Sequence, residues 1–143
     1  MAQRLLLCDD EVHIIRAAEF KLSRAGYDVE CAFDGEAGWQ AIQRQKPDLL
    51  IVDMQMPRLT GLGLIERIRA NDETKSLPIF MLTGKGFELS RDDILGRLGV
   101  LELIGKPFSP RDLLVKVNSV LKGTPVPVLS LDLTCDVGQA VSV

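Results

Sequence analysis

The sequence lacks the features that mark membrane proteins, nucleic-acid-binding proteins and secreted proteins. None of its apolar stretches reaches the ~18 residues that a membrane-spanning helix needs. Its net charge is −3, and it has neither a basic run nor interleaved basic and aromatic residues, so nothing indicates a nucleic-acid surface. The amino terminus runs into Asp9-Asp10-Glu11 and does not resemble a signal peptide. These absences favour a cytoplasmic protein that binds neither nucleic acid nor membrane.

Cysteine, histidine and tryptophan are also scarce. Cys8, Cys31 and Cys135 are widely spaced and form no metal-binding or redox pattern. We interpret them as small buried apolar residues in a reducing compartment. The single histidine, His13, is expected on a helix surface, and the single tryptophan, Trp39, is expected to pack against the core.

The apolar pattern predicts an α/β fold. The 143 residues are 46% apolar and 26% charged, which suits one globular domain. Strand-like and helix-like segments alternate five times, as in a parallel sheet built from βα units. Strands are predicted at 5–8, 28–32, 49–52, 79–82 and 101–104, and helices at 12–25, 35–45, 61–70, 90–98 and 110–121.

Helix boundaries and strand order follow from the same pattern. Gly26 is expected to end the first helix, Asp34 to cap the second, and Ser109 and Pro110 to begin the last. Three strands are continuously apolar, as central strands are, whereas strands 28–32 and 101–104 carry polar residues, as edges do. Right-handed crossovers then favour a flavodoxin-like (βα)5 doubly wound parallel sheet of order 2-1-3-4-5.

Residues 1–122 are predicted to form this domain, and residues 123–143 a tail without a second domain. The segment 123–127 contains Gly123, Pro125 and Pro127 and should break the last helix. Leu129, Leu131 and Leu133 then alternate with polar residues. This alternation leaves three interpretations open, namely a mobile tail, an added strand and a partner-binding segment.

Polar residues stand at the carboxyl ends of four predicted strands. Asp9 and Asp10 follow the first strand, and Asp53 follows the third. Thr83 and Lys106 follow the fourth and fifth. Because ligands of open α/β sheets bind beyond the carboxyl ends of the strands, these five side chains are expected to share one site.

Three carboxylates in one site favour a hard cation. Held ~5 Å apart, they would repel one another by about 3 kcal/mol per pair at an effective dielectric constant near 20. Mg²⁺ prefers oxygen ligands and would remove this repulsion. Asp10 and Asp53 suit direct coordination, and Asp9 suits coordination through water. Alone, Asp9-Asp10-Glu11 would also suit a helix start, where acidic residues interact favourably with the helix dipole.

Asp53 is the best candidate for a nucleophile. A carboxylate can attack phosphorus and form an aspartyl-phosphate, and Asp53 follows a central strand. Lys106 supplies a cation and Thr83 a hydroxyl donor for the charge that spreads over the phosphoryl oxygens. A cis peptide between Lys106 and Pro107 would aim the lysine into the site.

With these motifs in place, the chain resembles the receiver domain of two-component response regulators over about residues 3–121. The matching segments are Leu7-Cys8-Asp9-Asp10-Glu11, Val52-Asp53-Met54-Gln55-Met56-Pro57 with Gly61, Met81-Leu82-Thr83-Gly84-Lys85-Gly86, and Gly105-Lys106-Pro107-Phe108. Each segment is weak evidence alone, but four in this order at the right strand ends are specific.

The resemblance implies a phosphoacceptor signalling protein rather than an enzyme with external substrates. A histidine kinase or phosphotransfer protein would pass its phosphoryl group to Asp53 in a Mg²⁺-dependent reaction, and the signal would go on to a downstream protein. The implied metal site is Asp9, Asp10, Asp53 and Gln55, and the implied catalytic residues are Asp53, Thr83 and Lys106. Gln55 and Lys85 flank the path of the water that hydrolyses the phosphoryl group in this family.

The chain departs from the family pattern in three places. Leu103 stands where the family usually has a switch aromatic, Gly84 stands where alanine is common, and no output domain is recognisable. Three alternatives remain open, namely a receiver fragment of a larger regulator, a flavodoxin-like cofactor binder and a small phosphatase. Asp9-Asp10-Glu11 would repel the phosphate of a flavin, and the chain has little length for a phosphatase cap.

Overall fold

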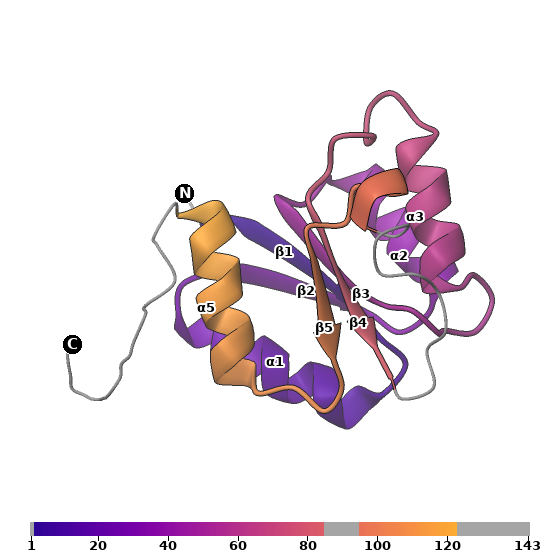
Figure 1. The fold of residues 1–143 in the computed structure, drawn as a ribbon. Helices are drawn as coiled ribbons and strands as arrows, with labels where there is room; N and C mark the ends of the chain where they lie inside the picture. The colour runs from indigo at the N-terminus through magenta and orange to yellow at the C-terminus, as the bar shows by residue number, and fades with distance from the viewer. Residues whose placement is uncertain (1, 85–94, 123–143) are drawn as a thin grey trace. The chain divides into compact units, whose positions relative to one another are not determined.

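The computed structural model describes residues 2–84 and 95–122 and contains a five-stranded parallel sheet (Figure 1). The strand order is β2-β1-β3-β4-β5, which confirms the predicted flavodoxin-like topology. The strands are β1 (Arg4–Cys8), β2 (Asp28–Ala32), β3 (Leu49–Asp53), β4 (Ile79–Thr83) and β5 (Glu102–Gly105).

Burial along the strands follows the predicted division into central and edge strands. Every residue of β3 is buried, as are four of the five residues of β1 and of β4. Only one residue of each edge strand, β2 and β5, is buried, which agrees with their polar residues. Asp53 and Thr83, expected just after their strands, are the last residues of β3 and β4.

The strand register brings the polar strand ends together. Cys8 of β1 pairs with Val52 of β3, so Asp9 and Asp53 are the next residues of adjacent strands. Thr83 of β4 pairs with Gly105 of β5, which precedes Lys106. The site therefore forms at one edge of the sheet, as parallel topology requires.

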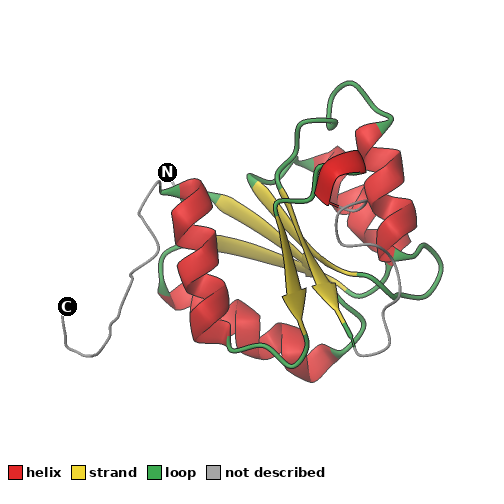
Figure 2. Cartoon of the chain, in the orientation of Figure 1, coloured by secondary structure: helices red, strands yellow, loops and turns green. Residues whose placement is uncertain are grey.

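The helices of the described residues are α1 (Val12–Arg24), α2 (Gly35–Arg44), α3 (Gly61–Arg69) and α5 (Pro110–Leu121) (Figure 2). The Asp34 side chain caps α2 by accepting a hydrogen bond from the Ala37 N–H at 2.8 Å. Gly26 follows α1 with a φ of 102°, a conformation that glycine adopts without strain. Of the predicted helix 90–98, residues 95–97 are helical and residues 90–94 lie outside the described part.

Helices cover both faces of the sheet within residues 1–111, which form one compact unit. Figure 1 shows α1 on the side opposite α2 and α3. One large core cluster joins α2 and α3 to alternate strand residues, among them Leu6, Leu50 and Val52. The described residues from 112 onward, which are most of α5, belong to a second compact unit.

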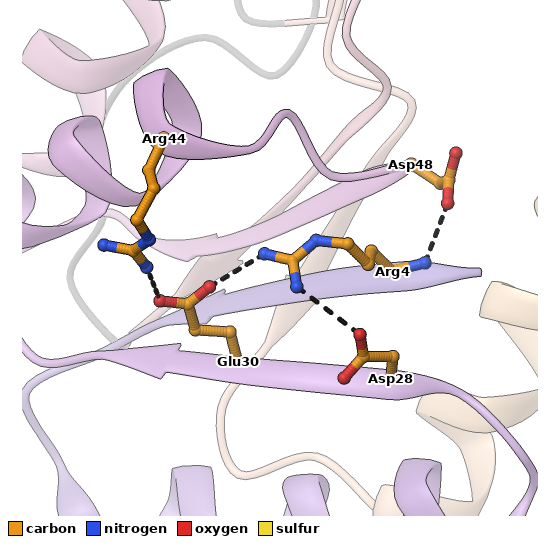
Figure 3. A network of polar contacts seen from close by, with 5 residues as sticks. All are labelled: Arg4, Asp28, Glu30, Arg44 and Asp48. Carbon is orange, nitrogen blue, oxygen red and sulfur yellow. Dashed lines mark hydrogen bonds and ion pairs between the residues drawn. The ribbon is translucent and has the colours of Figure 1, made fainter. Parts of the chain in front are cut away.

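A network of ion pairs holds the amino ends of β1 and β2 together (Figure 3). The Arg4 guanidinium bonds Glu30 at 2.8 Å and Asp28 at 3.4 Å, and Arg44 bonds the second Glu30 oxygen. The Arg4 N–H donates to Asp48 at 2.7 Å. Hydrogen bonds from Arg4 lower the pKa of Glu30. This network lies at the end of the strands away from the acidic site and fixes how β1, β2 and the start of β3 align.

Arg69, the last residue of α3, joins two loops through backbone carbonyls. Its guanidinium donates to the carbonyls of Leu77 at 2.8 Å and Lys75 at 3.0 Å in the loop before β4. It also donates to Leu98 at 2.7 Å and Gly99 at 3.1 Å in the loop before β5. These bonds satisfy carbonyl groups that no strand pairs.

The remaining residue-level expectations are largely confirmed. Cys8 is buried and Cys31 is half-buried, both are free thiols, and Cys135 lies outside the described residues. His13 is exposed on α1, and Trp39 packs partly buried against the core cluster. No helix among residues 2–84 and 95–122 has the length and apolar character needed to cross a bilayer.

Candidate functional site

Three aspartates meet at the carboxyl ends of β1 and β3. Carboxylate oxygens of Asp9, Asp10 and Asp53 all lie within 4.8 Å of one another. Asp9 and Asp53 are buried and Asp10 is exposed. An all-oxygen donor set with one open side fits Mg²⁺, which keeps several waters and binds one or two carboxylates.

Asp9 is held in place from both sides. Its backbone N–H donates to the Ala32 carbonyl at 3.1 Å, which continues the pairing of β1 with β2. Its Oδ1 accepts a hydrogen bond from the Glu11 N–H at 2.9 Å, where the chain turns into α1. The second oxygen, Oδ2, thus remains directed to the site, where Lys106 meets it at 2.8 Å.

Lys106 places a cation among the carboxylates. The Lys106–Pro107 peptide is cis, as predicted, and the Lys106 N–H donates to the Thr83 carbonyl at 2.7 Å. The Lys106 ammonium lies 3.3 Å from Asp53 and 2.6 Å from Glu11. With Asp9 at 2.8 Å, three carboxylates therefore lie within ion-pair distance of the Lys106 ammonium.

The electrostatics of the site are dominated by burial and by like charge. Burial first, then the Asp9 and Asp10 carboxylates, raise the pKa of Asp53 to about 6 against the opposing effect of Lys106. Burial alone would lower the pKa of Lys106, but the Asp9, Glu11 and Asp53 carboxylates raise it overall. The site therefore keeps its lysine charged and favours a proton or another cation on Asp53.

An open cavity of about 510 Å³ leads to Asp53. Its wall includes Asp10, Glu11, Asp53, Gln55, Gly84 and Lys106. Gln55 is exposed at the rim, which is consistent with a place beside an incoming group. Lys85, the second residue expected near the path of water, lies outside the described residues.

Thr83 lies at the site but its hydroxyl points to the neighbouring strand. Its Oγ1 donates to the Ile104 carbonyl of β5 at 3.5 Å, a long hydrogen bond. The described structure thus brings Asp9, Asp10, Asp53 and Lys106 into contact, and places Gln55 and Thr83 around them.

Glu11 is the residue that sequence reasoning missed. It was expected only as part of an acidic run at a helix start, yet its carboxylate makes the shortest ion pair of Lys106. The two residues are 95 positions apart in the chain. The available signal was a glutamate at the expected start of α1, because glutamate is not among the residue types that usually cap a helix.

Comparisons with known proteins agree with this geometry. The profile of the response regulator receiver domain matches residues 5–118. The alkaline phosphatase synthesis transcriptional regulatory protein PhoP of Bacillus subtilis is 34% identical over 137 residues, which are 95% of this chain and 55% of that protein. The chain spans about half the length of the curated relatives it matches.

Solved structures of response regulators and receiver domains are also similar to this chain. The chemotaxis response regulator CheY4 of Vibrio cholerae has a TM-score of 0.76 and 30% identity, over 85% of this chain and 100% of that one. The receiver domain of the sensor histidine kinase PA1611 of Pseudomonas aeruginosa, with a magnesium ion coordinated in its active site cleft, has a TM-score of 0.74 and 27% identity, over 87% and 100%. The chain therefore belongs to the response regulator receiver domain family, the signalling domains of two-component systems.

Proposed function

We propose that Asp53 accepts a phosphoryl group from the phosphohistidine of a histidine kinase or phosphotransfer protein. The observation that carries this proposal is the position of Asp53, a buried carboxylate that borders an open cavity with a lysine 3.3 Å away. An Asp53 oxygen attacks phosphorus, the phosphorus–nitrogen bond breaks, and the donor imidazole keeps the electron pair and takes up a proton.

Asp9, Asp10 and Asp53 are the proposed ligands of Mg²⁺, with Gln55 as the fourth contributor. Their oxygens fit a hard cation, and the receiver domain of PA1611 is a relative with magnesium in its cleft. When bound, the ion supplies positive charge against the three carboxylates and the phosphoryl oxygens.

Lys106 and Thr83 are the proposed protein groups that stabilise the transferred phosphoryl group. The Lys106 ammonium already lies beside Asp53, so it can pair with a phosphoryl oxygen after a short movement. Thr83 would have to exchange its long hydrogen bond to the Ile104 carbonyl for one to the phosphoryl group. A weak bond of this kind costs little to break.

The signal would then pass to a downstream protein, and the chain would act on no external substrate. We take residues 1–122 as the receiver domain and residues 123–143 as a tail without a second domain. The alternative is that this receiver belongs to a larger regulator, since the chain covers only 55% of the PhoP relative. A flavodoxin-like cofactor role is disfavoured because the carboxylates of Asp10, Glu11 and Asp53 line the cavity.

The test is phosphorylation by acetyl phosphate in Mg²⁺, mapped by mass spectrometry. We expect one phosphoryl group on wild-type protein, none on Asp53→Asn, and none in EDTA. Asp72→Asn is the matched control, because the Asp72 side chain is 95% exposed and does not line the cavity. Labelling that survives Asp53→Asn would refute the assignment of the acceptor.

A further inference from the structure

We propose that Glu11 restrains Lys106 in the unphosphorylated protein and must release it before Lys106 can bind a phosphoryl group. This inference rests on the proposed function of Asp53. It assigns a positioning role to a residue outside the predicted metal and catalytic set.

The three partners of Lys106 are not equivalent. Glu11 is nearest, at 2.6 Å, followed by Asp9 at 2.8 Å and Asp53 at 3.3 Å. The longest of the three distances is the one to the proposed acceptor. In this arrangement the ammonium is drawn toward Glu11 and Asp9, and a phosphoryl group on Asp53 would have to draw it back.

Glu11 is the partner that can leave at the lowest cost. The Asp9 side chain is only 2% exposed and is anchored by the Glu11 N–H, so its release would strand a buried charge. The Glu11 side chain is 56% exposed, and water can solvate its carboxylate as soon as it moves away.

The backbone of Glu11 is fixed, which confines any movement to the side chain. Its N–H donates to Asp9, and its carbonyl accepts from the N–H groups of Ile14 and Ile15 at 3.1 Å each. Glu11 is the N-cap of α1, yet its side chain makes no capping bond. The Glu11 carboxylate therefore pairs with Lys106 and does not cap α1.

Two consequences follow. Loss of the Glu11–Lys106 pair frees one N–H of Lys106 for the phosphoryl oxygens, so a phosphoryl analogue should bind more tightly. Because the Glu11 side chain is 56% exposed, the gain should be modest, about two- to fivefold in affinity. The same change also removes a negative charge from the cavity wall, and the experiment has to separate these effects.

The experiment measures binding of beryllofluoride, a mimic of the phosphoryl group on aspartate, by calorimetry in saturating Mg²⁺. Glu11→Gln removes the charge, whereas Glu11→Asp keeps the charge but shortens the side chain. Glu19→Gln is the matched control, because Glu19 lies on the same helix and pairs with Arg16 instead of Lys106. Each variant is also measured with Lys106→Met.

We expect tighter beryllofluoride binding for both Glu11 variants, no change for Glu19→Gln, and no gain from Glu11→Gln once Lys106 is methionine. Glu11→Asp binding that equals wild type would attribute any gain to charge alone and overturn the restraint. So would equal or weaker binding by Glu11→Gln. If wild-type protein itself fails to bind beryllofluoride, the proposed function fails, and not the role of Glu11.

Metal-free thermal unfolding gives a second readout that needs no phosphoryl analogue. In EDTA, Glu11→Gln and Lys106→Met should be non-additive, because each removes the same ion pair. Additive losses of stability would show that the two side chains do not interact in solution and would also overturn the proposal.

Discussion

At the scale of single residues, Asp53 combines a favourable position for chemistry with an unfavourable environment for its own charge. It is 7% exposed, and two further carboxylates lie within 4.8 Å. Lys106 compensates only in part, since the pKa of Asp53 remains raised to about 6. The Asp53 site is therefore stabilised by a bound cation or a proton, because either one neutralises the clustered carboxylates.

The first prediction concerns Asp53→Asn in EDTA. The folded pKa of about 6 lies above the ordinary value of 3.8, so ionisation destabilises the wild-type fold increasingly as pH rises from about 4 through 6. At 1.36 kcal/mol per pKa unit the effect approaches about 3 kcal/mol above pH 6. Asp53→Asn should therefore be more stable than wild type at pH 7.5, with the difference vanishing near pH 4.

Urea unfolding at several pH values measures this difference directly. Saturating Mg²⁺ should reduce the difference in unfolding free energy between Asp53→Asn and wild type, because the ion stabilises only the wild-type protein, which has all three carboxylates. A metal-free Asp53→Asn protein that is less stable than wild type at pH 7.5 would mean that the Lys106 pair outweighs burial and repulsion.

The second prediction compares two glycines of the site. A Cβ at Gly61 would lie 2.1 Å from the Asp53 carbonyl oxygen and 2.8 Å from the Met54 Cα, both of which are backbone atoms. Gly61→Ala must therefore displace the chain next to Asp53, and we expect a loss of about 2–4 kcal/mol together with weaker Mg²⁺ binding.

Gly84→Ala is the control for Gly61→Ala. Its Cβ would meet no atom of residues 2–84 and 95–122 within 4 Å, although Gly84 also lines the cavity. Its stability should stay within about 0.5 kcal/mol of wild type. Equal losses of stability for the two variants, measured by chemical unfolding, would contradict the steric argument.

For the residues of the site, the sequence predicted which of them come together better than it predicted the contacts that their side chains make. Asp9, Asp10, Asp53 and Lys106 were predictable because parallel strands end at a common edge. The Glu11–Lys106 pair was not, because it depends on the direction of one side chain at a helix start. The hydrogen bond from Thr83 to Ile104 was hidden for the same reason, since a rotamer has no signature in the sequence pattern.

At the scale of elements, apolar periodicity located every strand, and capping residues located most helix ends. β2 occupies the predicted residues, and α5 begins at Pro110 as expected. The Thr60 cap of α3, whose Oγ1 accepts from the Gly63 N–H at 3.0 Å, was overlooked. The Arg69 contacts to four carbonyls were unpredictable, because they depend on where two loops meet in space.

The third prediction concerns β5, where Leu103 takes the place of the family's usual aromatic residue. Leu103 is half-buried against the core cluster, beside Met81 of β4. An aromatic ring that moves from solvent into a pocket changes buried area more than leucine does, and only such differences shift an equilibrium. Beryllofluoride should therefore alter β5 less than it alters the region of Thr83.

Amide chemical shifts with and without beryllofluoride measure this contrast. We expect large shifts at Asp53, Thr83 and Gly84, and smaller ones along Glu102–Gly105. Shifts of equal size along β5 would show that Leu103, or another residue, transmits the change without an aromatic ring.

At the scale of the whole molecule, the described core is contained within the five βα units that the family profile covers. The buried apolar residues of the described chain run from Leu5 to Val117. The profile matches residues 5–118, nearly the same span. Residues 123–143 lie outside the described part, so the sequence-based domain boundary at 122 remains a prediction.

The fourth prediction is that deletion of residues 124–143 leaves folding and site chemistry unchanged. The buried apolar residues of the described core all lie before residue 124. The melting temperature should therefore stay within about 1–2 °C of the full chain, and beryllofluoride affinity should equal that of the full chain. Ile65→Ala is the positive control, because Ile65 is fully buried in the core cluster, and this variant should lose about 2–5 kcal/mol of stability. If deletion of residues 124–143 lowers the melting temperature by several degrees, about 1 kcal/mol for a domain of this size, the alternating Leu129, Leu131 and Leu133 pack against the domain. An unchanged melting temperature with altered beryllofluoride binding would instead assign the tail to regulation of the site.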